Sequence, residues 1–372
     1  MSVAESTQSR PLAERSEPIP DSMRAAVYLG TGRVAVETVK TPALGPGEIL
    51  IRVESCGICH TDLKKIEHDL LPPPRIYGHE TAGVIAAIGD RVTKYRIGDR
   101  VIVFHHIPCR ECFYCDRRLY AQCAMYKKIG VTAGYEPAGG GFAQYVRVMD
   151  WIVENGVEII PDAVSFDVAC WVEPVNTCLK AVQLLDLRRG DIVAILGQGP
   201  IGLIFTMLAM RTGATVLATD TIEFRRGLSE RLGASAFDPR EHEFEHAVKT
   251  LTDARGADAV IVATNAQGLV EEALKTSRPG AKILLFAQTA AMERIEISGA
   301  DVCVGERMLL GSYSADADLQ AESARLVFSG ELPLQQLISD HVSLDEINRG
   351  IAIAQHPGDR SLKVIVHPQE QN

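Results

Sequence analysis

The sequence predicts an α/β protein of two domains, one rich in β-strands and the other built on a doubly wound parallel sheet. Three observations carry this prediction. The chain of 372 residues is longer than one hydrophobic core usually serves. Its N-terminal third consists of short β-rich runs separated by glycine and proline, whereas from about residue 190 apolar strands alternate with helical patterns. Such alternation indicates a parallel, doubly wound sheet.

The β-rich region shows strand periodicity between residues 25 and 60. The runs AAVYLG, RVAVETV and EILIRVESCG are bounded by glycine and proline, as strands usually are. In the third run, Ile49, Ile51 and Val53 occupy alternate positions, which is the period of a strand. We therefore expect three strands before residue 60.

The second region consists of a series of expected strands and helices. The strands are DIVAILG, TVLATD, ADAVIVAT and AKILLFA. The helices between them are PIGLIFTMLAMRTG, which Gly213 ends, RRGLSERLG and LVEEALKTS.

Composition and charge favour a globular protein that acts on small molecules. Hydrophobic residues make up 46% of the chain and charged residues 23%, which is ordinary for a globular protein. The net charge of -10 argues against nucleic acid or an anionic membrane surface as the main partner. With no signal peptide and no long apolar run, a cytoplasmic protein without membrane spans is expected. Residues 1–22, which are polar, are expected to form a disordered tail.

Four of the nine cysteines fall in one short stretch, PCRECFYCDRRLYAQC. Cys109, Cys112, Cys115 and Cys123 have the spacing C-x2-C-x2-C-x7-C. In a reducing compartment such a cluster is more often a metal site than a set of disulfides. A ferredoxin-like iron–sulfur cluster would continue with a three-residue gap and Cys-Pro, and neither follows here. We therefore predict a closed structural zinc site that holds a loop in shape.

The stretch GQGPIG follows an expected strand and opens an expected helix. At such a junction Gly197 allows the tight turn, Gly199 lets a pyrophosphate approach the backbone, and Gly202 permits close packing of helix and strand. The dinucleotide site is expected to include Pro200 and Ile201. A glycine turn that binds no nucleotide is the alternative interpretation.

Cofactor choice is expected to depend on Asp220, which ends the next expected strand. A carboxylate there can accept hydrogen bonds from the ribose hydroxyls and repels a 2′-phosphate, so the sequence predicts NAD in preference to NADP. Arg225 and Arg226 follow closely, and Arg225 is expected at the cofactor. NADP is therefore not excluded.

Two further motifs, GICHTD and GHETAG, combine a thiol, an imidazole and a carboxylate. These residue types hold a catalytic zinc ion while leaving one coordination position open. Together with the cysteine quartet and GQGPIG, they occur in the order found in the zinc-containing medium-chain alcohol and polyol dehydrogenases. The chain resembles that family over residues 24–368, and the glutamate of WVEPVNTC makes it more similar to the sorbitol and threonine dehydrogenase branch.

The resemblance implies a GroES-like β-rich catalytic domain and a Rossmann NAD-binding domain. The catalytic domain is expected to be discontinuous, with residues 23–174 and 314–372 and RSLKVIVHP as a closing strand, and residues 175–313 would form the Rossmann domain. Substrate and nicotinamide would meet between the two. Two Zn²⁺ per chain are implied, one catalytic and one structural, the latter in a lobe beside the active site.

The resemblance assigns the catalytic zinc to Cys59 and His79. Glu80 resembles a carboxylate that binds zinc in some members and moves in and out of contact in others. Glu173 stands where the alcohol branch often has a cysteine and the polyol branch a glutamate, and either glutamate could be the permanent third ligand. Cys56, three residues before Cys59, is expected to be a packed thiol and not a ligand.

The resemblance also implies a mechanism. The zinc binds the substrate hydroxyl, lowers its pKa and stabilises the alkoxide from which hydride passes to the nicotinamide. Thr61 resembles the hydroxyl that begins the proton relay, and Asp62 resembles a carboxylate that orients the zinc ligands. Lys64 stands where some alcohol dehydrogenases carry a relay histidine, so the later part of the relay stays open.

Several further positions are assigned by the resemblance. His60 and Lys363 match positions that contact the cofactor phosphates, and Thr177 is expected near the nicotinamide. His105 and His106 are expected to be ordinary loop or surface residues.

The expected function is that of a zinc-dependent oxidoreductase that transfers a hydride between NAD and an alcohol. A secondary alcohol of a polyol, sugar alcohol or cyclitol is the expected substrate, and a homo-oligomer, a tetramer or alternatively a dimer, is the expected assembly. A simple alcohol dehydrogenase, a non-catalytic nucleotide-binding scaffold and a zinc-free reductase of alkenes or quinones are the alternatives.

Overall fold

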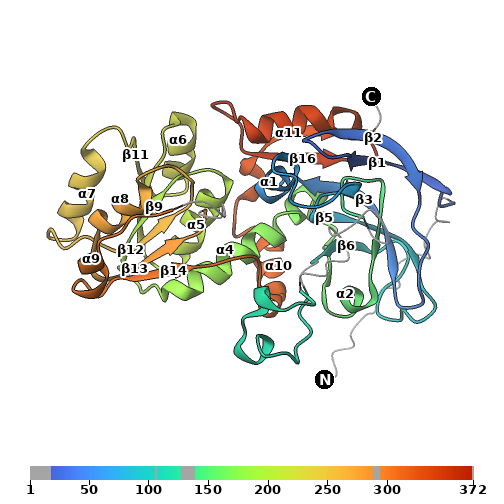
Figure 1. Ribbon diagram of the computed structural model, residues 1–372, viewed down its shortest axis with the longest axis horizontal. Coiled ribbons are helices and arrows are strands. Elements are labelled where there is room, and N and C mark those ends of the chain that lie inside the picture. Colours follow the sequence, from blue (N-terminus) through green and yellow to red (C-terminus); the bar gives the residue numbers. More distant parts are fainter. Residues whose placement is uncertain (1–17, 105–106, 127–138, 288–293, 371–372) are drawn as a thin grey trace, which may run out of the picture.

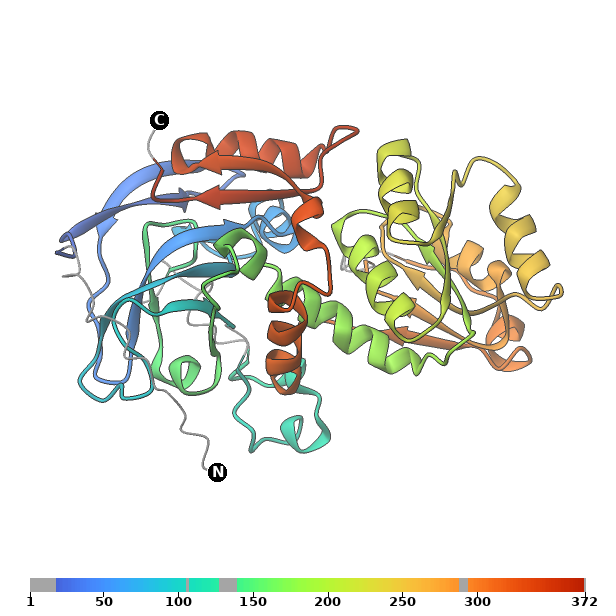
Figure 2. The ribbon, with the colours of Figure 1, turned by 180° about the vertical axis from the view of Figure 1, so that it is seen from behind.

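The computed structural model describes residues 18–104, 107–126, 139–287 and 294–370. They form two lobes that lie side by side along the long axis of the molecule (Figure 1). One lobe holds the β-rich sheets and the other the parallel sheet, and the view from behind shows the same division (Figure 2). The expected combination of a β-rich part with a doubly wound parallel sheet is confirmed.

The β-rich lobe contains two sheets. Strands β2-β1-β4 form the smaller one, and a seven-stranded sheet has the order β15-β16-β3-β5-β6-β8, with β7 paired to β3. The three strands expected before residue 60 are confirmed as the first three of the structure. The bounds are β1 (Ser22–Tyr28), β2 (Val34–Lys40), β3 (Ile49–Gly57), β4 (Arg75–Ile76), β5 (Glu80–Ile88), β6 (Arg100–Val103), β7 (Tyr145–Val148), β8 (Val157–Ile159), β15 (Ile338–Ser343) and β16 (Lys363–His367).

The expected N-terminal tail lies almost wholly outside the described residues. Its last residue, Ser22, begins β1 and pairs with Lys40 across the smaller sheet.

Strand β3 is central to the larger sheet. It pairs antiparallel with β5 along its length, with β7 beside its first half and with β16 beside its last two residues. Leu50 is buried as well as Ile49 and Ile51, so both faces of this part of the strand are covered. The C-terminal segment is predicted to return to the first domain. Its residues after 337 supply β15 and β16 to this sheet.

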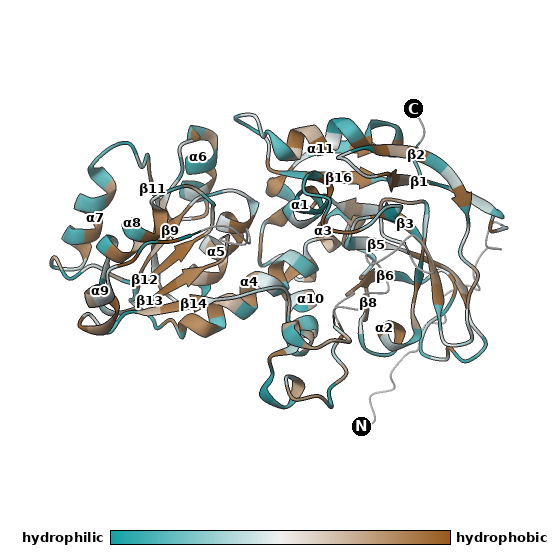
Figure 3. Ribbon diagram, viewed as in Figure 1, coloured by the Kyte–Doolittle hydropathy of each residue, from teal (hydrophilic) through white to brown (hydrophobic). Residues whose placement is uncertain are grey.

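The second lobe is built on a six-stranded sheet of order β11-β10-β9-β12-β13-β14, in which every pair is parallel. Apolar strands run between helices with polar outer faces (Figure 3). The four expected strands are confirmed as β9, β10, β12 and β13, whereas β11 and β14 were not predicted. The bounds are β9 (Ile192–Leu196), β10 (Thr215–Thr219), β11 (Ser235–Phe237), β12 (Ala257–Val262), β13 (Ser277–Leu285) and β14 (Met308–Gly311).

Helix α4 (Val172–Leu185) leads from the β-rich lobe into the other lobe, and α10 (Gln320–Phe328) packs against it (Figure 1). In the described part of the chain, no helix is long and apolar enough to cross a membrane. The remaining helices are α1 (His60–Glu67), α2 (Asp150–Asn155), α3 (Phe166–Ala169), α5 (Pro200–Arg211), α6 (Glu223–Arg231), α7 (Glu243–Leu251), α8 (Leu269–Thr276), α9 (Gly299–Cys303) and α11 (Ile347–Gln355).

Candidate active site and metal centres

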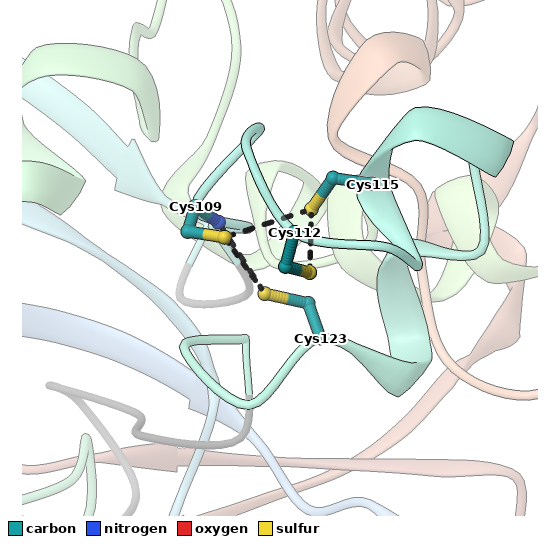
Figure 4. Close-up of side chains that lie close together, drawn as sticks. All are labelled: Cys109, Cys112, Cys115 and Cys123. Carbon is teal, nitrogen blue, oxygen red and sulfur yellow. Dashed lines mark hydrogen bonds between the residues drawn. The ribbon is translucent and has the colours of Figure 1, made fainter.

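The four clustered cysteines point toward one another (Figure 4). The measured Sγ–Sγ distances are 3.9 Å from Cys109 to Cys115, 3.6 Å from Cys112 to Cys115 and 3.6 Å from Cys109 to Cys123. Four thiolates at about 2.3 Å from one zinc ion in a tetrahedron lie about 3.8 Å apart. The spacing of the sulfurs therefore fits zinc with no open position for a substrate.

Hydrogen bonds prepare one of these thiols for metal binding. The Sγ of Cys123 accepts a hydrogen bond from the backbone N–H of Cys109 at 3.4 Å. Burial acts to raise the pKa of Cys123, but backbone N–H groups and the Cys109 thiol outweigh burial and lower this pKa to about 6. A thiolate is the form that binds zinc, so the hydrogen-bond donors around Cys123 favour its metal-binding form.

The cysteine lobe is anchored to the segment that precedes α10. Tyr120 donates to Asp318 at 2.7 Å, and Arg110 pairs with the other oxygen of the same carboxylate at 2.8 Å. Tyr126 donates to the carbonyl of Ala315 at 2.7 Å. These bonds join residues about 200 positions apart, so they tie the lobe to this segment of the chain.

Three candidate ligands of a second metal ion meet where β3 and β5 lie side by side. Cys59 directly precedes α1, and His79 and Glu80 stand at the start of β5. Their ligating atoms all lie within 4.8 Å of one another. They meet because the antiparallel register pairs Gly57, the last residue of β3, with Glu80.

Asp62 holds two of the candidate ligands, Cys59 and His79, in place. One carboxylate oxygen lies 3.0 Å from Nδ1 of His79, and the other accepts the backbone N–H of Cys59 at 3.3 Å. Burial acts to raise the pKa of Asp62, but the His79 ring outweighs it, and the pKa lies below the usual range. A carboxylate that binds Nδ1 leaves Nε2 of the imidazole for a metal ion.

Glu80 forms a buried ion pair with Lys363 of β16. The Lys363 ammonium also donates to the carbonyl of Ile58 at 3.2 Å and lies 5.3 Å from the centre of the Trp171 ring. Burial acts to lower the pKa of Lys363, but the Glu80 charge outweighs it and raises the pKa. A Cβ atom at Gly57 would overlap the Glu80 carboxylate, so only glycine fits there.

Glu173 lies in the first turn of α4 and lines one small cavity together with Glu80. Burial raises the pKa of Glu173 to about 7, so this carboxyl group can gain or lose a proton near neutral pH. Among the described residues, it stands outside the group of ligand atoms formed by Cys59, His79 and Glu80.

Cys56 is fully buried, and its Sγ lies 3.6 Å from the hydroxyl of Thr81, the residue opposite it on β5. Burial raises the pKa of this thiol above its usual range, which keeps it protonated. These contacts fit the packed thiol that the sequence predicts.

The glycine motif lies between β9 and α5, and Asp220 directly follows β10. A Cβ atom at Gly202 would overlap the carbonyl of Gly197, so close packing by itself requires glycine at position 202. A Cβ at Gly199 would meet no described atom closer than Arg225 at 3.9 Å, so packing does not require this glycine. The open space at Gly199, at the N-terminus of α5, fits a phosphate that approaches the backbone.

Asp220 is buried, and its carboxylate accepts the backbone N–H groups of Gln198 and Ile222 at 2.8 and 2.9 Å. Arg225 lies 3.9 Å from this carboxylate and donates to the carbonyl of Ser361 in the other lobe. Arg226 pairs with Asp238 at 3.2 Å. The structure therefore brings Asp220, Arg225 and Arg226 together at the end of β10.

The remaining predicted residues are placed as follows. His60 and Thr61 are exposed on the first turn of α1, while the hydroxyl of Thr177 donates within α4 to Pro174. Lys363 is expected at the cofactor phosphates, and its ammonium lies beside Glu80. His105 and His106 lie outside the described residues.

Sequence reasoning did not single out two sets of residues. One is the anchor of the cysteine lobe, with Tyr120 and Asp318, and the other is the trio Asp167, His341 and His367. Their members come from distant parts of the chain, so no local spacing could have indicated them.

Comparisons with known proteins agree with this geometry. The family "Alcohol dehydrogenase GroES-like domain" matches residues 45–158, and "Zinc-binding dehydrogenase" matches residues 200–329. Sorbitol dehydrogenase of Bacillus subtilis (strain 168) is 29% identical over 357 residues, which cover 94% of this chain and 98% of that protein. L-threonine 3-dehydrogenase of Pyrococcus horikoshii is 33% identical over 264 residues, which cover 69% of this chain and 73% of that protein.

A solved structure is similar over the same range. It is a protein described as a zinc-binding dehydrogenase from Sinorhizobium meliloti 1021, bound to NADP. The TM-score is 0.85 at 28% identity, with 94% of this chain and 100% of that chain covered.

These similarities define a zinc-binding dehydrogenase with a GroES-like domain. The chain belongs to the zinc-containing medium-chain alcohol and polyol dehydrogenase family. It is a zinc-dependent oxidoreductase that acts on alcohols with a nicotinamide cofactor. The family, the fold class and the reaction class expected from the sequence are confirmed.

The cysteine lobe provides a first test. Replacing Cys112 by serine should remove about one zinc ion per chain and lower the melting temperature, because a hydroxyl is a poor fourth ligand. Zinc per chain and thermal unfolding measure this. Cys303→Ser is the matched control, since Cys303 is exposed in α9 and should change neither quantity. A Cys112→Ser protein that keeps its zinc and melts like the parent would contradict the structural site.

The buried ion pair provides a second test. Lys363→Met should lower the free energy of unfolding by about 3–5 kcal/mol, because it leaves the Glu80 carboxylate buried without its partner. Adding Glu80→Gln should restore much of that stability. Lys249→Met, which breaks an exposed pair with Glu245, should change the urea unfolding curve little. If Lys363→Met and Lys249→Met have the same free energy of unfolding, Lys363 does not balance a buried charge.

Proposed function

We propose that the protein oxidises a secondary alcohol of a polyol, sugar alcohol or cyclitol, with NAD as the preferred acceptor and two zinc ions per chain. One ion is catalytic, held by Cys59 and His79 with a carboxylate from Glu80 or Glu173, and the other is held by the cysteine quartet. The observation that carries this proposal is the pair of contacts by which one buried carboxylate, Asp62, holds both Cys59 and His79.

The proposed substrate class rests on the Glu173 carboxylate and on the relatives. Glu173 occupies the position at which a glutamate is typical of the polyol branch. The similarity to a sorbitol dehydrogenase over 94% of this chain supports a polyol substrate.

When bound, zinc acts as a Lewis acid that lowers the pKa of an alcohol, and the nicotinamide accepts the hydride. The protein's own groups bind, orient and move protons. Asp62 contacts Nδ1 of His79 and so leaves Nε2 as the nitrogen that would hold the zinc ion. Glu173, with a pKa of about 7, can take up a proton in the buried site, and Thr61, exposed two residues after Cys59, offers a hydroxyl toward solvent.

The cofactor belongs to the second lobe in this proposal. The open space at Gly199 supports a pyrophosphate at the N-terminus of α5, and Asp220 supports a ribose with a free 2′-hydroxyl. The similar structure with bound NADP and the arginines near Asp220 make cofactor preference a question for measurement. We assign residues 175–313 to the cofactor domain and residues 23–174 and 314–372 to the catalytic domain.

A cytoplasmic homo-oligomer, a tetramer or a dimer, completes the proposal. Strand β14 is an edge of the parallel sheet, and three large apolar side chains are exposed on or near it: Val304, Met308 and Tyr313. An edge strand with exposed apolar neighbours favours pairing with a second copy. A monomer in light scattering would contradict this part of the proposal.

Substrate class is tested with a panel of polyols, cyclitols, sugar alcohols and simple alcohols, each with NAD at alkaline pH. We expect the highest kcat/KM with a secondary alcohol that carries neighbouring hydroxyls. Activity confined to simple primary alcohols would overturn the polyol assignment while leaving the reaction class intact.

Removal of one thiolate tests the catalytic zinc. Cys59→Ala should lower zinc from about two ions per chain to about one and reduce turnover by several orders of magnitude, while NAD binding survives on the other lobe. Cys56→Ala is the control, because Cys56 is buried against Thr81 and should keep both ions and most activity. If Cys56→Ala loses a zinc ion and Cys59→Ala does not, the ligand assignment is wrong.

Substitution at the end of β10 tests cofactor choice. Asp220→Ala should shift the ratio of kcat/KM toward NADP by roughly 10- to 100-fold, because it removes ribose contacts and a charge that repels the 2′-phosphate. Asp191→Ala is a matched control, since that carboxylate also accepts a backbone N–H, from Arg188, but precedes β9 at the opposite end of the sheet. An unchanged ratio in Asp220→Ala would mean that Asp220 does not contact the ribose.

A further inference from the structure

Two histidines and an aspartate meet outside the site described above. Asp167 lies in the short helix α3, His341 in β15 and His367 at the end of β16. One ligating atom from each lies within 4.8 Å of the others. The trio joins the last strands of the chain to a segment 200 residues earlier.

The two imidazoles approach the two oxygens of one carboxylate. Nε2 of His367 lies 2.9 Å from Oδ1 of Asp167, and Nδ1 of His341 lies 3.5 Å from Oδ2. Ligand atoms at about 2.0 Å from a zinc ion in a tetrahedron are separated by about 3.3 Å. Each measured distance joins an imidazole nitrogen to a different carboxylate oxygen and lies close to that value, so a small shift of the rings toward one oxygen would accommodate an ion.

Further contacts orient the trio. Nδ1 of His367 lies 3.0 Å from Glu370, and the hydroxyl of Ser55 donates to Oδ1 of Asp167 at 2.5 Å. If Nδ1 donates its proton to Glu370, Nε2 presents a lone pair to the Asp167 oxygen. Two acceptors at 2.9 Å need a positive charge between them, either a second proton on the ring or a metal ion.

We infer that Asp167, His341 and His367 form a third metal site that takes a divalent first-row transition ion, with zinc as the ion expected. Two imidazoles and one carboxylate suit such ions, and the carboxylate on the far nitrogen of His367 is the arrangement that usually supports a ligating histidine. The His341 side chain is 46% exposed, so solvent reaches the site and would supply the remaining ligands of a bound ion.

Such an ion would clamp β15 and β16 to α3. Strand β16 carries Lys363, the partner of Glu80, and α3 precedes α4, which carries Glu173. The role is therefore structural, and the site exchanges its ion with solvent more readily than the closed cysteine site does.

Metal counting tests the inference. Zinc-loaded parent, His341→Ala and His356→Ala proteins are dialysed together against one buffer that holds free Zn²⁺ at a low micromolar level, and zinc per chain is measured by mass spectrometry. His356 is exposed at the end of α11 and serves as the matched control. The parent and His356→Ala should each hold one ion more than His341→Ala. Equal counts in all three overturn the inference.

The test compares zinc per chain between variants. Its result therefore does not depend on how many ions the cysteine-containing sites hold. A cobalt titration gives a second readout, on protein first dialysed without added metal so that the readily exchanging trio is empty while the cysteine-containing sites keep their zinc. Cobalt at the trio should show visible d–d absorption without a thiolate-to-cobalt charge-transfer band, and Asp167→Asn, which keeps the size of the side chain, should lose that absorption. A spectrum with only the thiolate band, or one that Asp167→Asn leaves unchanged, overturns the inference.

Discussion

The register of strand β3 is the constraint on which the site depends. On one side, its antiparallel pairing with β5 places Gly57 opposite Glu80, so Cys59 and His79 meet although they are 20 residues apart in the chain. On the other side, pairing with β16 brings Lys363 to the same end of the strand. A slip by one residue would turn alternate side chains to the opposite face and separate these groups.

Buried charges in the site occur with a compensating partner. Asp62 balances the ring of His79, and Glu80 balances Lys363, so desolvation of each carboxylate is offset by a nearby positive or protonated group. Glu173 is different, because burial dominates its surroundings and raises its pKa to about 7. Under the function proposed above, such a carboxyl group is suited to exchange a proton near neutral pH.

The cysteine lobe is connected to the active site through hydrogen bonds. Its tyrosines bind the segment that contains Ala315 and Asp318, and Asp316 of the same segment exchanges two hydrogen bonds with the Asn176 side chain, three residues after Glu173 in α4. The position of the cysteine lobe is thereby coupled to the helix that carries Glu173. Under the function proposed above, a metal ion in the quartet would hold that helix in place without taking part in the reaction.

The sequence by itself determined the local features of this protein. Apolar periodicity predicts β1 to β3 and the strands β9, β10, β12 and β13, and the spacing of the quartet and of GQGPIG predicts a metal loop and a phosphate turn, because each depends on residues within about a dozen positions. Only the tertiary structure decided the position of Lys363 beside Glu80, the contact of Asp62 with both ligands and the meeting of Asp167 with His341 and His367. These contacts depend on strand register and on the return of the C-terminal segment to the first sheet, and neither leaves a local pattern in the chain.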